Sequence, residues 1–105
     1  MNKQTKATSI PKSVKCNVFK RDGYRCILCG SPQGQPNAHY IPRSQGGLGI
    51  EENIITLCPD CHREYDQSDK RSIYGERIRQ YLIRQYPEWN AKNLKYKKWS
   101  FTNDQ

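Results

Sequence analysis

Four cysteines arranged as two close pairs are the residues of this sequence best suited to chemistry. Cys26 and Cys29 form one C-x-x-C pair, Cys58 and Cys61 form the other, and 28 residues separate the pairs. Two such pairs provide the four thiolates that a tetrahedral structural zinc ion takes. Disulfides or free thiols are the alternative, and a redox role is less favoured because it needs only one pair. We therefore predict a closed structural zinc site.

The composition indicates why this chain needs a metal. Leu, Ile, Val and Phe account for only 18 of its 105 residues, and the net charge is +8. Such a chain is too short for two independent cores, and its composition is typical of disordered proteins. Zinc binding would contribute folding free energy that so small a core lacks. Cys16, the fifth cysteine, is expected to pack on the buried side of a helix.

Charge is distributed unevenly along the chain. Residues 1–25 contain seven Lys or Arg and one acid, residues 26–68 contain two and five, and residues 69–98 contain nine and three. An acidic centre between two basic arms favours a polyanion such as nucleic acid, held from both sides. General solubility is the alternative explanation for the excess of lysine and arginine.

Local patterns predict the elements that position these residues. Apolar side chains at helical spacing indicate helices, with Ile73, Ile78 and Leu82 on the buried side of the last one, and Ser9 is a candidate cap for the first. The expected elements are a flexible basic tail over 1–9, a helix over about 11–21, a turn-rich loop over 30–36, a short strand over 39–41, a second strand or a buried turn over 53–57, a helix from Pro59 through Asp66, and a helix over 70–86.

The segments around the cysteine pairs form a specific set of motifs. VFKRDGYRCILCG, HYIPRSQGG, ENIITLC and CPDCH, within about residues 14–66, resemble the HNH endonucleases of the His-Me-finger group. The resemblance implies an α+β fold, a small zinc-stapled ββα-metal (HNH) domain with flanking helices. Residues 10–68 would form the zinc-bound nuclease core, and residues 69–105 a basic C-terminal helix and tail packed on it. The layout is also similar to short HNH proteins of phages and prophages.

The resemblance implies a role for individual residues. His39 matches the general base at the end of the first strand, and Asn53 matches the residue that braces the loop carrying that base. His62 matches a ligand of the catalytic Mg²⁺ or Mn²⁺ ion near the start of the finger helix. Some members have a further ligand four positions on, where this chain has Asp66. A solvent-exposed helix carboxylate is the alternative interpretation of Asp66.

One position departs from the family pattern. Ala38 stands where many members have an Asp or His ligand directly before the base. The ion would then depend on His62, Asp66, water and a substrate phosphate. In a second register His39 would be the ligand and Tyr40 would stand at the base position, which suits the chemistry poorly. We therefore take His39 as the base and expect weak metal binding with a preference for Mn²⁺.

The function implied is a metal-dependent DNA endonuclease that hydrolyses phosphodiester bonds, associated with a phage or prophage and acting in the cytoplasm of a bacterial host cell. No apolar run is long enough for a membrane span or a signal peptide. Arg43 is a candidate phosphate contact or a plain turn residue, and Arg77 and Arg79 are candidate DNA contacts. The alternatives are a non-catalytic zinc-dependent module that binds DNA or is a partner of phage packaging proteins, and a zinc-ribbon adaptor that contacts protein.

Overall fold

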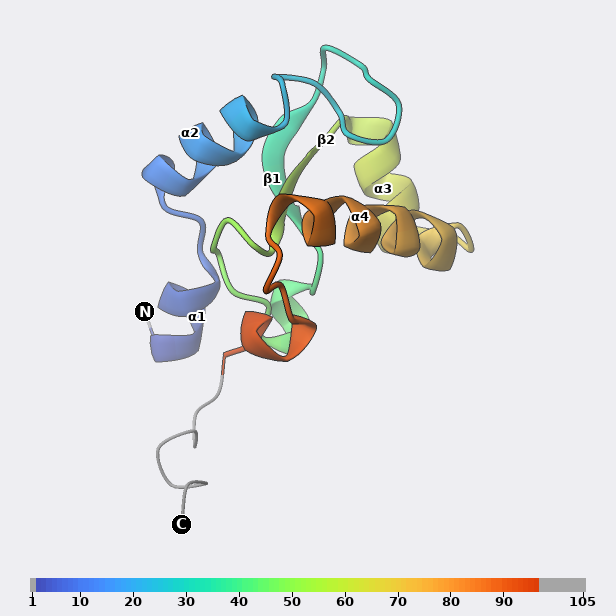
Figure 1. Ribbon diagram of the computed structural model, residues 1–105. Coiled ribbons are helices and arrows are strands. Elements are labelled where there is room, and N and C mark those ends of the chain that lie inside the picture. The colour runs from blue at the N-terminus through green and yellow to red at the C-terminus, as the bar shows by residue number, and fades with distance from the viewer. Residues whose placement is uncertain (1, 97–105) are drawn as a thin grey trace.

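The structure, a computed structural model, describes residues 2–96 and has a small α+β fold with flanking helices, which confirms the predicted fold class. Figure 1 shows α2 on one side of the two strands and α3 and α4 on the other. The elements are α1 (Lys3–Thr8), α2 (Lys12–Arg21), β1 (Gln35–His39), η1 (Arg43–Gln45), β2 (Ile54–Leu57), α3 (Pro59–Gln67), α4 (Arg71–Gln85) and η2 (Ala91–Leu94).

The strands β1 and β2 pair antiparallel, and helices cover both faces of the pair. Ala38 lies opposite Ile55, and His39 lies opposite Ile54. Successive side chains of a strand point to opposite faces. Ala38 and Ile55 belong to the buried core cluster formed with α3 and α4, so His39 is directed to the other face. On that side, Thr56 donates its backbone N–H to Asp22, which follows α2.

Strand β1 begins and ends earlier than the predicted strand over 39–41. A register shift between Gln35 and Ala38 marks a bulge, which accommodates a proline that cannot donate to the ladder, here Pro36. Beyond His39 the backbone N–H of Tyr40 still donates to the carbonyl of Asn53, and the ladder ends at Ile41, whose N–H donates to the side chain of Asn53 at 2.8 Å.

The N-terminal segment is helical where the sequence predicts a flexible tail over 1–9. Asn2 caps α1 by accepting a 2.7 Å hydrogen bond from the backbone N–H of Thr5. Ser9 ends α1, with its hydroxyl donating to the carbonyl of Thr5, and does not cap α2, which begins after Pro11 without a side-chain cap. Thr8 is only 2% exposed, so contacts with the rest of the molecule hold this segment in place.

The helices α2, α3 and α4 agree with the predicted helices, but two side chains face the other way. Cys16 is exposed, because α2 buries Val18 and a position two residues away lies about 200° around the helix. Ile73 is 62% exposed, whereas Ile78 and Leu82 are fully buried. The predicted apolar side of α4 is therefore buried at Ile78 and Leu82 but not at Ile73.

The chain after α4 returns to the loop that precedes β2. Leu94 is buried, and its carbonyl accepts a 2.8 Å hydrogen bond from Leu48. Tyr96 donates its backbone N–H to the carbonyl of Gly46. Residues 97–105 of the predicted C-terminal tail lie outside the described residues. Within residues 2–96, none of the helices has the length and apolar character needed to cross a bilayer.

Candidate functional site

The four cysteines predicted as zinc ligands converge at one end of the sheet. Their sulfur atoms all lie within 4.8 Å of one another, and the sulfurs of Cys29 and Cys58 are 3.6 Å apart. In a tetrahedral site with Zn–S bonds of about 2.3 Å, neighbouring sulfurs are about 3.8 Å apart. Cys26, Cys58 and Cys61 are buried, and Cys29 is exposed. The donor set fits a zinc ion and leaves no coordination position for a substrate.

The electrostatics of these thiols also favour a bound cation. Burial works to raise the pKa of Cys26, but backbone hydrogen bonds from Cys58, Cys29 and Leu28 lower it to about 7. Burial and the adjacent thiols raise the pKa of Cys61. Like charges at this distance oppose one another's ionisation. The four sulfurs can all become thiolates only if a cation shares their charge, which is what a metal ion does.

Helix α3 connects the sulfur cluster to a second group of polar side chains. Cys58 is the N-cap of α3, and its sulfur accepts a hydrogen bond from the backbone N–H of Cys61. His62 follows directly, and Asp66 lies one turn further on the same face of the helix. His62 Nε2 and Asp66 Oδ2 are 3.2 Å apart, with side chains 31% and 44% exposed. A metal bound by the cysteines would therefore anchor the turn that carries this pair.

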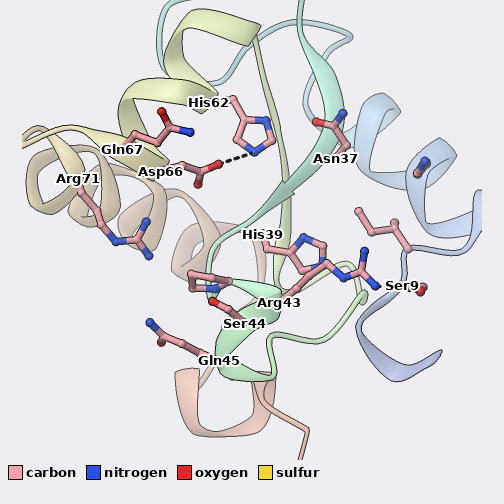
Figure 2. Close-up of a pocket in the computed structure, with 13 residues that line it drawn as sticks. Ser9, Asn37, His39, Arg43, Ser44, Gln45, His62, Asp66, Gln67 and Arg71 are labelled. Carbon is pink, nitrogen blue, oxygen red and sulfur yellow. Dashed lines mark hydrogen bonds and ion pairs between the residues drawn. The ribbon is translucent and has the colours of Figure 1, made fainter. Parts of the chain in front are cut away.

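A cavity of about 790 Å³ lies between α3 and β1. Figure 2 shows His62 and Asp66 on one wall and Asn37 and His39, from β1, on the other. The structure therefore brings His39, His62 and Asp66 into one cavity, although His39 and His62 come from different elements. Both nitrogen and oxygen donors face this space.

His39 has a defined hydrogen-bonding partner. Its Nε2 lies 2.8 Å from the backbone carbonyl oxygen of Thr8. A carbonyl oxygen can only accept, so Nε2 carries the hydrogen and Nδ1 of the neutral ring is unprotonated. Burial lowers the pKa of His39 below its ordinary value of 6.5, and Arg43 and His62 act in the same direction; the Thr8 carbonyl and Asp66 oppose them. The ring is accordingly neutral at pH 7 and has a nitrogen that can accept a proton.

Asn53 is fully buried and joins both ends of the loop that follows His39. Its side-chain oxygen accepts a hydrogen bond from the backbone N–H of Ile41, at 2.8 Å. Its side-chain amide donates to the carbonyls of Ile41 and Leu48, at 3.2 and 2.8 Å. These contacts brace the loop, as the family resemblance implies for this position.

The family pattern has a ligand directly before the base, at position 38, but the residue before His39 that faces the cavity is Asn37. Ala38 is fully buried in the apolar core cluster and does not line the cavity. Asn37 does line it, and Figure 2 shows its carboxamide turned toward His62. Sequence reasoning missed Asn37, although one signal was available: a residue two positions from His39 shares its face of the strand.

Three basic side chains, Lys15, Arg43 and Arg71, line the same cavity. Of these, the sequence indicated only Arg43, because no local motif marks the other two. Arg77 and Arg79 do not line the cavity. Arg77 donates to the carbonyl of Leu28, and Arg79 forms a 2.8 Å ion pair with Glu76. Their contact with DNA stays a prediction.

Comparison with known proteins agrees with this geometry. The family model described as HNH endonuclease matches residues 26–68, which include both cysteine pairs and the cavity residues of β1 and α3. The protein described as Anaredoxin, from Nostoc sp. strain PCC 7120, is 37% identical over 53 residues, which are 50% of this chain and 70% of that relative. The chain belongs to the HNH endonuclease family.

A second relative of this HNH protein is a restriction enzyme by its description. The type IV methyl-directed restriction enzyme EcoKMcrA of Escherichia coli strain K12 is 34% identical over 71 residues. That similarity covers 57% of this chain but only 26% of the restriction enzyme. The shared part is therefore a limited portion of a longer protein.

Proposed function

We propose that this HNH protein is a metal-dependent DNA endonuclease whose active site is the cavity between β1 and α3. The observation that carries the proposal is that His39, with an unprotonated Nδ1, faces the same cavity as the His62–Asp66 pair. Membership of the HNH family and similarity to a restriction enzyme support DNA as the substrate. Association with a phage or prophage, implied by the resemblance alone, belongs to the same proposal.

The donors around the cavity suit a small divalent cation. His62 offers a ring nitrogen, Asp66 a carboxylate oxygen, and Asn37 a carboxamide oxygen. Mixed nitrogen and oxygen sites suit Mn²⁺, and oxygen ligands suit Mg²⁺. We assign these three residues as its ligands, with Asn37 in place of the missing ligand at Ala38. A divalent ion bound there would stabilise the negative charge that develops on the phosphate and on the leaving oxygen.

The chain's own residues carry out the proton transfer and hold the substrate. Nδ1 of neutral His39 takes a proton from the water that attacks phosphorus, while Nε2–H stays bonded to Thr8. The new P–O bond replaces the bond to the 3′ oxygen, which takes a proton from solvent and leaves as a hydroxyl. Lys15, Arg43 and Arg71 bind the phosphates of the strand at the cavity rim.

Nicking of supercoiled plasmid by the zinc-loaded protein tests the proposal. Nicked product with Mg²⁺ or Mn²⁺ and none with EDTA is the expected result. Cys16→Ser is the matched control, because Cys16 is exposed and lies outside both sites. One alternative is a non-catalytic zinc-dependent DNA-binding or packaging-partner module. The burial of Ala38 favours it, because the position that holds a metal ligand in many family members offers none here. A protein that shifts DNA in a gel but never nicks it would establish that alternative and overturn the endonuclease.

A further inference from the structure

The partner of His39 comes from a segment outside the matched HNH region. The family match begins at residue 26, whereas the carbonyl that accepts from His39 Nε2 belongs to Thr8, 31 positions earlier in the chain. Among residues 2–96, the Thr8 carbonyl is the one hydrogen-bond partner of the His39 ring. The orientation of the proposed base therefore depends on where the end of α1 lies.

Backbone contacts hold the end of α1 against the loop that follows His39. The backbone N–H of Gly49 donates to the carbonyl of Ala7 at 3.0 Å. A Cβ atom at Gly49 would lie 2.0 Å from the carbonyl oxygen of Ser9, so only glycine allows this approach. Thr8 is 2% exposed at this contact. The segment is thus closely packed at the point where it meets His39.

Side chains add a second set of contacts to the same segment. Arg43, on the cavity wall, donates from Nε to the hydroxyl of Thr8 at 3.3 Å and from Nη2 to the hydroxyl of Ser9 at 3.4 Å. A helix as short as α1, with six residues, is not stable alone in water. Its position therefore follows from these tertiary contacts and is open to disruption by single substitutions.

We propose that α1 is a positioning element for the general base, in which the Thr8 carbonyl holds His39 as the Nε2–H tautomer with Nδ1 available to accept a proton. This inference rests on the proposed role of His39. When α1 is displaced, the ring loses its partner, and both its orientation and its tautomer vary. Loss of the hydrogen-bond partner of a metal-binding histidine costs about 10–100-fold in metal affinity or activity, and we expect a loss of similar size for this histidine.

Two substitutions in the full chain displace the carbonyl from different sides. Gly49→Ala places a Cβ against Ser9. Ser9→Pro disfavours the helical conformation of Thr8, because the residue before a proline avoids it, and it removes the Ser9 N–H that donates to Thr5. The matched control is Gly75→Ala, whose Cβ would meet Tyr65 at an ordinary 3.4 Å.

The measurements are the ring ¹⁵N chemical shifts of His39 in the zinc-loaded protein and the kcat and KM for DNA cleavage. We expect the Nε2–H tautomer in the unsubstituted protein and in the Gly75→Ala control. Gly49→Ala and Ser9→Pro should show averaged His39 shifts and a kcat lower by about 10–100-fold, with zinc content and His62 shifts unchanged.

An Nδ1–H tautomer in the unsubstituted protein would overturn the proposal even if neither variant folds. Unchanged His39 shifts and kcat in both folded variants would overturn it as well. The NMR measurement needs no cleavage, so an inactive protein that keeps the Nε2–H tautomer would refute the endonuclease and leave the Thr8 contact established.

Discussion

The cysteine cluster and the histidine cavity share helix α3 but differ in almost every other respect. The cluster has four identical donors within 4.8 Å of one another. The cavity of about 790 Å³ has mixed nitrogen and oxygen donors, of which His62 and Asp66 remain partly exposed. A closed set of four ligands can only stabilise structure, whereas an open, incomplete set leaves room for water and substrate. Cys61 and His62 are adjacent in the chain, but the first belongs to the closed cluster and the second lines the open cavity.

The largest effect is expected from breaking the closed site. Cys58→Ser should abolish zinc binding and the cooperative melting transition together, because the small core cannot compensate for the lost metal. Zinc content and circular dichroism on heating measure both properties. Cys16→Ser is the control, since Cys16 is exposed and belongs to neither site. If Cys58→Ser melts like the unsubstituted protein, the cluster does not stabilise the fold, and the contrast between the two sites fails.

The open site should respond in the opposite manner. His39→Ala should keep zinc, fold and DNA affinity while the cleavage rate falls about 10²–10⁴-fold, the usual loss for a general base. Plasmid nicking, a gel shift and the melting curve give the three readouts. Cleavage at the parental rate would show that His39 has no part in the chemistry.

The ligand set of the open site is tested by a pair of neighbouring substitutions. Asn37→Asp adds a charged oxygen donor to the cavity wall and should tighten Mn²⁺ binding by about tenfold or more, because ligand charge raises cation affinity. Ala38→Asp should leave Mn²⁺ affinity unchanged and lower the melting temperature, because it buries a carboxylate in the apolar cluster. Calorimetric titration of the zinc-loaded proteins measures the Mn²⁺ affinity of the two variants, and thermal melting measures the loss of stability. Tighter Mn²⁺ binding by Ala38→Asp would show that position 38, which the family pattern indicates, faces the cation.

The smallest expected effect concerns DNA contact around the cavity. Each lost phosphate contact lowers the slope of log affinity against log salt by about 1. Replacing Lys15 and Arg71 with glutamine should therefore lower the slope by about 2. The same change at Arg77 and Arg79 should have less effect, because neither of these side chains lines the cavity. A larger change for the second pair would place the DNA along α4 and away from the cavity.

Features that depend on short-range spacing could be read from the amino-acid sequence. Residues three or four apart in a turn or a helix lie close together through local geometry alone, so the cysteine pairs and the His62–Asp66 pair were predictable. The buried strand 53–57 and the buried positions Ile78 and Leu82 followed from apolar patterning in the same way. Family resemblance singled out Asn53 as a brace of the loop and Ala38 as a departure from the family pattern. In the structure Asn53 bonds to Ile41 and Leu48 at the two ends of that loop, and Ala38 is buried.

Features that join distant segments were decided by tertiary structure. The bulge between Gln35 and Ala38 sets which side chains of β1 face the cavity, and it exists because Pro36 cannot donate to the ladder. α1 has too few apolar residues and is too short to form alone, so only its contacts with Gly49, His39 and Arg43 make it a helix against the site. Hydrogen bonds that span more than 30 positions leave no periodic trace in the chain, and for that reason the setting of the proposed base became visible only in the folded molecule.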